Sequence, residues 1–118
     1  TLLGDSAHAM LPYLAQGAGQ SIEDACVLAS LLERFAEDPN TALERYQMLR
    51  LPRTRQIQLG ARERGRLNHL SSPWARLWRD AGITLRRWGG GGRALQDIAW
   101  IYGYDAARPP GDALAPAA

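Results

Sequence analysis

GDSAHAMLPYLAQGAGQ, residues 4–20, is the most informative segment of this chain for its fold. Leu2 and Leu3 precede it with the character of a buried strand end, and Asp5 follows that strand end. Residues 16–19 are rich in glycine and lead into a helical pattern, so their amides would lie at a helix N-terminus, where anions are stabilised. The stretch therefore predicts a site in which Asp5 binds a hydroxyl-bearing tail and the amides bind an anionic ring.

This spacing resembles the second flavin-binding motif of the single-component FAD-dependent aromatic hydroxylases, in particular the salicylate hydroxylase-like group. The motif reads roughly GD-x-A-H-x-x-x-P-x-x-x-Q-G-x-x-x-x-x-E-D-A, which is specific because a carboxylate, a proline and a helix start must fall at fixed offsets. A weaker similarity continues through about residue 105, in RLPR at 50–53, GRLNHL at 65–70 and WIYGYD at 100–105. The matching motif positions are Gly4, Asp5, Ala7, His8, Pro12, Gln16, Gly17, Glu23, Asp24 and Ala25.

By this resemblance the chain is expected to be a C-terminal fragment of a class A FAD-dependent aromatic monooxygenase. The implied fold is an α/β FAD-binding fold, Rossmann-like and of the glutathione-reductase type. This chain would carry one N-terminal strand end of it followed by several helices, and would itself be mainly α. A fragment agrees with the missing dinucleotide fingerprint G-x-G-x-x-G and with a start at Thr1 in mid-strand, without an initiator methionine.

The sequence patterns and the resemblance together predict three divisions of the chain. Residues 1–38 would form the C-terminal part of the FAD-binding domain, with the GD motif and a flavin-facing helix. Residues 39–105 would form a C-terminal helical region, and the alanine- and proline-rich residues 106–118 a disordered tail.

A first helix is expected over residues 18–36, because apolar residues recur there every three or four positions. Residues 38–40 (DPN) would end it. Thr41, with Glu44 three residues later, has the pattern of a capping box and would begin a second helix, which Pro52 kinks or restarts. The apolar positions of the first helix are Ile22, Ala25, Ala29, Leu32 and Ala36.

Residues 53–70 contain many arginines and few apolar anchors, which predicts a mostly solvated helix. Residues 71–73 (SSP) supply a cap and an N1 proline for a further helix, whose apolar stripe indicates a core or a subunit contact. A glycine loop is expected at 89–92, and a short helix or turn at 95–102. The stripe consists of Trp74, Leu77, Trp78, Ala81, Leu85 and Trp88.

The resemblance assigns the cofactor site to residues on either side of the loop. Asp5 would accept hydrogen bonds from the ribityl hydroxyls of FAD, whereas a cap for the next turn is the plainer alternative. The helix-start amides would face the flavin's pyrimidine edge, although a plain helix entrance also explains the glycines. Pro12 would line the substrate pocket or stiffen the loop. The residues predicted to bind the cofactor are Gly4, Asp5, Gln16, Gly17, Ala18 and Gly19.

No catalytic acid or base is expected in this chain, because the cofactor carries the chemistry. His8 is expected to form a structural hydrogen bond, and neither His8 nor His69 has a partner at metal-ligand spacing, so no metal site is predicted. Glu23 and Asp24 are adjacent on a helix, do not share a face, and are not an acid–base pair. One of them would cap the helix start or pair with an arginine.

Composition restricts the other classes of function. The chain has a net charge of +2, all fourteen of its basic residues besides histidine are arginines, and no apolar run is long enough for a bilayer. The arginines at 53–66 would face water, carboxylates or a nicotinamide cofactor's phosphates, and no nucleic-acid motif accompanies them. The single Cys26 fits a reducing cytoplasm. We therefore expect no membrane and no nucleic acid as partners, and a homo-oligomer is open for the full-length protein.

The favoured function is hydroxylation of a small salicylate-like aromatic acid by a full-length enzyme that uses FAD, NADH or NADPH, and O2. The fragment itself is expected to be inactive. A non-catalytic helical interaction module or remnant is the alternative from another class, since the dinucleotide half is missing. Another flavoprotein with the same motif, an epoxidase or a reductase, is the third.

Overall fold

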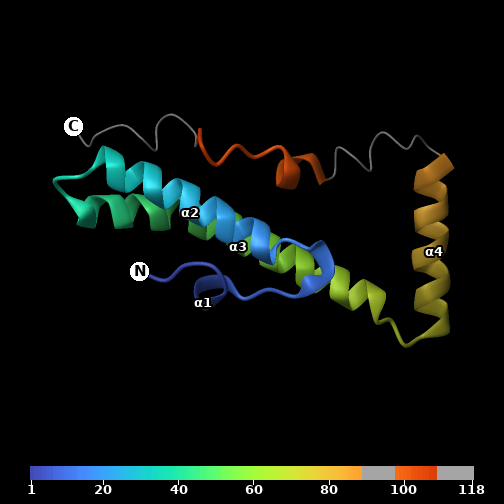
Figure 1. The fold of residues 1–118 in the computed structure, drawn as a ribbon. Helices are drawn as coiled ribbons and strands as arrows, with labels where there is room; N and C mark the ends of the chain where they lie inside the picture. Colours follow the sequence, from blue (N-terminus) through green and yellow to red (C-terminus); the bar gives the residue numbers. More distant parts are fainter. Residues whose placement is uncertain (89–97, 109–118) are drawn as a thin grey trace. The chain divides into compact units, whose positions relative to one another are not determined.

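The computed structural model describes residues 1–88 and 98–108, and these residues are mainly helical (Figure 1). Within them, Leu2 and Leu3 form no strand, because a strand needs a partner strand and the described residues offer none. The short helix expected at 95–102 is observed over 98–102, while Leu95 and the glycine loop at 89–92 lie outside the described residues. The elements are α1 Asp5–His8, the 3-10 helix η1 Pro12–Leu14, α2 Gly17–Arg34, α3 Pro39–Asn68 and α4 Pro73–Trp88.

Helix α2 confirms the helix expected over 18–36, but its buried face differs from the apolar stripe. The Gln20 amide donates to the Gln16 carbonyl at 2.8 Å, and the helix ends where the Phe35 amide donates to the Leu31 carbonyl. Ile22 is 65% exposed. The buried face contains two polar residues because it faces α3, which carries their binding partners. Its members are Gln20, Asp24, Val27 and Leu31.

Helix α3 begins two residues before the predicted capping box, so that prediction is wrong. Pro39 occupies the first position, where its fixed φ suits a helix and a missing amide costs nothing. Asp38 supplies the cap instead, since its carboxylate accepts from the Thr41 amide at 3.3 Å and from the Thr41 hydroxyl at 2.6 Å. Residues 53–68 continue the same helix.

Pro52 lies inside α3 and does not restart it. A proline within a helix leaves one carbonyl a turn earlier without its amide donor. Pro52 lies on the exposed side of α3, where water can bind that carbonyl. Two residues on, the Thr54 hydroxyl shares its proton between the carbonyls of Arg50, at 2.9 Å, and Leu51, at 3.3 Å. This hydroxyl adds a side-chain donor to the carbonyls of the same turn.

Helices α2 and α3 form an antiparallel hairpin, in which α3 returns alongside α2 after a four-residue connection (Figure 1). The apolar core lies between them, and Leu28, Phe35, Leu49 and Ala106 pack against it. Full burial of a side chain such as Val27 or Leu31 stabilises the fold by about 1.5–3 kcal/mol. The buried residues of this cluster are Val27, Leu31, Ala42 and Tyr46.

The described residues fall into two compact units, 1–62 with 105–108, and 63–88 with 98–104. In the second unit, Arg76 Nε donates to the Leu70 carbonyl and Arg79 Nη1 to the Leu67 carbonyl, which holds the start of α4 against the preceding chain. The predicted stripe lies on the surface of this unit, where Trp78 is 77% and Trp88 86% exposed, so it is not a core here. None of the described helices is long and apolar enough to cross a membrane. Of the predicted disordered tail, residues 109–118 lie outside the described residues.

Candidate functional site

Gly4 forms a sharp turn that sets the position of Asp5. Its φ of 59° and ψ of −139° lie in a region that residues with a side chain rarely adopt. The Gly4 carbonyl accepts hydrogen bonds from the Ala7 and His8 amides at 2.9 Å each. Asp5 is therefore the first residue of α1. Gly4 is the N-cap residue of α1, and no side chain of the described residues caps this helix, so the alternative interpretation of Asp5 as a cap is wrong.

The turn places Asp5 beside the N-terminus of α2. A Cβ atom built on Gly17 would lie 3.8 Å from Asp5 Oδ1. The Asp5 carboxylate is exposed and accepts no hydrogen bond from another residue in the described part of the chain. The structure thus brings together the two parts of the predicted cofactor site, a helix start and a carboxylate that has no partner in the described part of the chain.

The start of α2 presents the other predicted residues. Gln16 is a buried N-cap residue, Ala18 is exposed, and Gly17 and Gly19 are half-buried. The Gln20 amide makes the first helical bond, to Gln16, so the amides of residues 17–19 have no carbonyl within the helix. These amides carry the positive end of the helix dipole.

Pro12 is exposed and begins η1. Its carbonyl accepts a hydrogen bond from the Ala15 amide at 3.0 Å, and Ala15 adopts a left-handed conformation with φ of 52°. Pro12 therefore starts a tight turn between Asp5 and Gln16.

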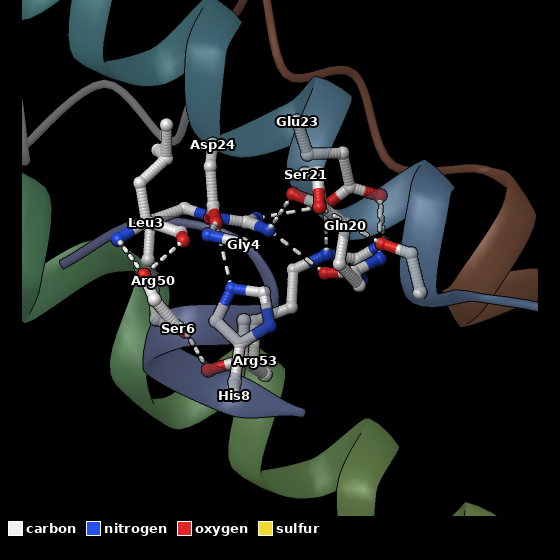
Figure 2. Close-up of polar contacts among 12 residues, drawn as sticks. Leu3, Gly4, Ser6, His8, Gln20, Ser21, Glu23, Asp24, Arg50 and Arg53 are labelled. Carbon is white, nitrogen blue, oxygen red and sulfur yellow. Dashed lines mark hydrogen bonds and ion pairs between the residues drawn. The ribbon is translucent and has the colours of Figure 1, made fainter. Parts of the chain in front are cut away.

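A buried ion-pair network connects the Gly4 turn to both long helices (Figure 2). Asp24, wholly buried on α2, accepts from the Gly4 amide at 2.9 Å and from His8 Nε2 at 2.6 Å through Oδ2. Its other oxygen accepts from Arg50 Nε of α3 at 2.7 Å. This confirms the structural hydrogen bond expected of His8.

Glu23 joins the same network from the next position of α2. Its carboxylate accepts from Arg50 Nη1 at 2.7 Å, from Arg53 Nε at 2.7 Å and from Arg53 Nη2 at 2.8 Å. Gln20 adds a donor to Glu23 at 3.0 Å and an acceptor for Arg50 at 2.8 Å. The expected pairing with an arginine is confirmed, but for both acids at once, because the long Arg50 side chain reaches across both positions. Arg53 lies partly buried in this network, not on a fully solvated face.

Local sequence patterns do not identify Arg50 as the central residue of this network. Arg50 is 2% exposed and lies 26 residues from Asp24 in the chain. The available signal was the segment RLPR at 50–53 in the family resemblance, next to two adjacent acids in need of a partner. Helical periodicity does not reveal such a pairing, since it identifies faces and not the contacts between two helices.

The network keeps both acids ionised. Burial would raise the pKa of the Asp24 carboxyl, but hydrogen bonds from Arg50, Gly4 and His8 outweigh burial and lower that pKa below its usual value. Burial likewise opposes ionisation of Glu23, yet Arg53 and Arg50 lower its pKa. Burial, with the nearby Asp24 carboxylate, raises the pKa of Tyr46 to about 12. Asp24 therefore acts as an acceptor only, and Tyr46 stays protonated at neutral pH.

Acidification is expected to destabilise this unit through Glu23 and Asp24. Because both pKa values are lower in the folded chain, the stabilisation is complete at neutral pH. It declines as the pH falls below the unfolded values of about 4 and is lost once the pH passes the folded values. Urea unfolding of the complete protein at stepwise lower pH measures the decline. Glu23→Gln should make it shallower, and an unchanged slope would contradict the assignment.

A cavity of about 590 Å³ lies between the N-terminal residues and α3. His8, Arg50 and Thr54 are among its lining residues, and none of the residues predicted to bind the cofactor lines it. The Nδ1 atom of His8 is buried and has no hydrogen-bond partner among the described residues. The predicted cofactor site is therefore separate from this cavity.

Comparison with known proteins gives a family match over half of the chain. The family model described as FAD binding domain matches residues 1–60. A 3-amino-4-hydroxybenzoate 2-monooxygenase of Streptomyces platensis is 51% identical over 108 residues, which cover 91% of this chain and 26% of that protein. A 3-hydroxybenzoate 6-hydroxylase of Aquipseudomonas alcaligenes is 39% identical over 89% of this chain and 32% of its own length.

A salicylate hydroxylase of Pseudomonas putida is 48% identical over 75 residues, or 61% of this chain and 17% of that protein. The chain thus spans about a quarter of the length of the first of these relatives. The segment that matches the family model, residues 1–60, includes the Gly4 turn and the ion-pair network, which together lie within residues 4–53.

Proposed function

Because this chain belongs to the FAD binding domain family, we propose that it supplies the second flavin-binding motif of an FAD-dependent aromatic monooxygenase. The single observation that carries the proposal is the Asp5 carboxylate beside the start of α2, which has no partner among the described residues. The relatives are named for hydroxylation of aminohydroxybenzoate, hydroxybenzoate and salicylate, which supports a small aromatic acid as substrate. NADH or NADPH and O2 would be the co-substrates.

The donors and acceptors of the site fit FAD. The Asp5 carboxylate is a strong acceptor for the hydroxyls of a ribityl chain, since charge-assisted hydrogen bonds are about twice as strong as neutral ones. The amides of Gly17, Ala18 and Gly19 suit the oxygen and nitrogen acceptors of the pyrimidine edge. When bound, FAD supplies electron transfer from the nicotinamide and activation of O2.

The residues of this chain bind and orient the cofactor and transfer no proton. The positive end of the α2 dipole favours negative charge on the ring by about 0.3–1 kcal/mol, or more in a buried setting. Gly17 and Gly19 lack side chains that would hold a ligand away from these amides. Pro12 would line the aromatic substrate pocket.

The finer fold is part of the same proposal. Leu2 and Leu3 would pair as the end of a strand in a Rossmann-like α/β sheet, and the exposed Ile22 side of α2 would face that sheet. The protein would work in the cytoplasm, where the single Cys26 stays reduced.

The test is expression of the complete reading frame that encodes this chain. We expect a yellow protein that contains FAD, and oxidation of NADH or NADPH that is accelerated by 3-hydroxybenzoate, salicylate or 3-amino-4-hydroxybenzoate. Mass spectrometry should detect a product with one added oxygen atom. A protein that takes up no FAD after reconstitution would instead support a non-catalytic interaction module.

Replacement of Asp5 by alanine is expected to weaken FAD binding by about 10- to 100-fold, the value of one or more hydrogen bonds to a charged acceptor. The melting temperature of the apoprotein should not change, because Asp5 is exposed and has no partner in the described structure. Titration of apoprotein with FAD, followed by quenching of flavin fluorescence, measures the effect. Asp38→Ala is the matched control: it removes an exposed cap of α3 and should leave FAD affinity unchanged. Equal affinities for Asp5→Ala and wild type would refute the Asp5 assignment.

A further inference from the structure

We infer that Asp24 is a positioning residue, which holds Asp5 at a fixed place beside the N-terminus of α2. The inference rests on the proposed function, because it concerns the two groups that would contact the flavin. It assigns the geometry of that site to one buried carboxylate, and not to the loop that connects the two groups.

Asp24 binds the chain on both sides of Asp5. It accepts from the Gly4 amide, one residue before Asp5, at 2.9 Å. It also accepts from Nε2 of His8, the last residue of the short helix that Asp5 begins, at 2.6 Å. Both contacts use the same oxygen, Oδ2 (Figure 2). With its two ends bound to one atom, the segment 4–8 has little freedom to move relative to Asp24.

The acceptor stands on the helix whose start would contact the flavin. Asp24 follows Gly17 by seven residues on α2, which is about two turns, or a rise of about 10 Å. A helix is stiff over that length, so Asp5 and the amides of residues 17–19 move as one body. The loop 9–16 between them can then vary without changing their separation.

Two further contacts support this arrangement. Arg50 donates to Oδ1 of Asp24 at 2.7 Å, which orients the carboxylate and leaves Oδ2 for the Asp5 segment. Gly4 has room for no side chain, because a Cβ there would lie 2.7 Å from the Ser21 hydroxyl oxygen of α2. The backbone before Asp5 therefore lies directly against α2, next to the Asp24 contact.

Glu23 provides a matched control, because it is also an acid of α2 that binds Arg50, yet it makes no contact with Gly4 or His8 among the described interactions. Asp24→Asn and Glu23→Gln both remove one negative charge from the same network. They differ in whether the removed charge holds the Asp5 segment. A purely structural role of the network predicts similar effects of the two substitutions.

The experiment compares Asp24→Asn, His8→Ala and Glu23→Gln in the complete protein. Hydrogen exchange of the amides in segment 4–8 is measured on the protein without cofactor. The dissociation constant and the midpoint potential of FAD are measured after reconstitution. Asp24→Asn should speed the exchange and weaken FAD binding by about tenfold or more, the loss of one strong contact. The midpoint potential of its bound FAD should become more negative, because the helix start no longer meets the pyrimidine edge.

Glu23→Gln should lower the melting temperature but leave the exchange, affinity and potential at wild-type values. His8→Ala keeps the ion pair of Asp24 with Arg50. It should change exchange, affinity and potential in the same direction as Asp24→Asn but by smaller amounts, so it replaces Asp24→Asn as the test if that variant does not fold. The inference is overturned if Asp24→Asn and His8→Ala exchange and bind FAD like wild type, or if Glu23→Gln has equal effects. Failure of the wild type to bind FAD would refute the proposed function alone, since the exchange measurement still tests the position of Asp5.

Discussion

Arg50→Ala is expected to lower the free energy of unfolding by about 3–5 kcal/mol, because it leaves buried negative charge without its partner. Arg50 is 2% exposed and donates to both Asp24 and Glu23, each at 2.7 Å. Asp24 is wholly buried, so water cannot replace the lost donor there. The loss should exceed that of any exposed arginine of the chain, for which ion pairs contribute about 1 kcal/mol or less.

Urea unfolding of the complete protein measures this effect. Arg55→Ala is the control, since Arg55 lies on the exposed side of the same helix and should cost less than about 0.5 kcal/mol. Arg50→Met, which keeps most of the length of the side chain, should be almost as destabilising as Arg50→Ala, because the cost comes from the charge. A methionine variant as stable as the wild type would show that packing, and not charge pairing, is what Arg50 contributes.

Gly4→Ala is expected to destabilise the protein by roughly 2–4 kcal/mol and to weaken FAD binding with it. The first reason is the backbone, since φ of 59° with ψ of −139° is accessible almost only to glycine. The second is space, because the added Cβ would lie 2.7 Å from the Ser21 hydroxyl oxygen. Relief of either strain would move the Gly4 amide away from Asp24 and shift Asp5.

Thermal unfolding and FAD titration of the same preparation measure the two effects of Gly4→Ala together. Gly82→Ala is the matched control, because Gly82 lies within α4 and a Cβ there would meet no atom of the described residues within 4 Å. That substitution should be neutral or stabilise by up to about 1 kcal/mol, the helix propensity difference. A Gly4→Ala protein with wild-type stability would mean that the turn has another conformation in solution.

Local patterns identified the helices with their approximate boundaries. Glycine at the start of α2 and Pro73 at the start of α4 are signals that act within one turn, and both helices begin within a residue of the expected place. The start of α3 was missed by two residues, because Asp38 next to an N1 proline competes with Thr41 as a cap and binds its amide. The strand end at Leu2 and Leu3 has no regular structure here, since a strand depends on distant partners.

Motif spacing is a property of the chain alone, so it sufficed to identify the family and to predict the two groups of the candidate site, Asp5 and the glycine-rich helix start. Which face of α2 is buried, and how Asp24, Glu23 and Arg50 combine, depends on the packing of α2 against α3. Burial of an ion pair depends on what lies opposite, and the opposite residue here is 26 positions away on another helix. For the same reason, the nearness of Asp5 to Gly17 follows from the contact of Gly4 and His8 with Asp24, which no local pattern encodes.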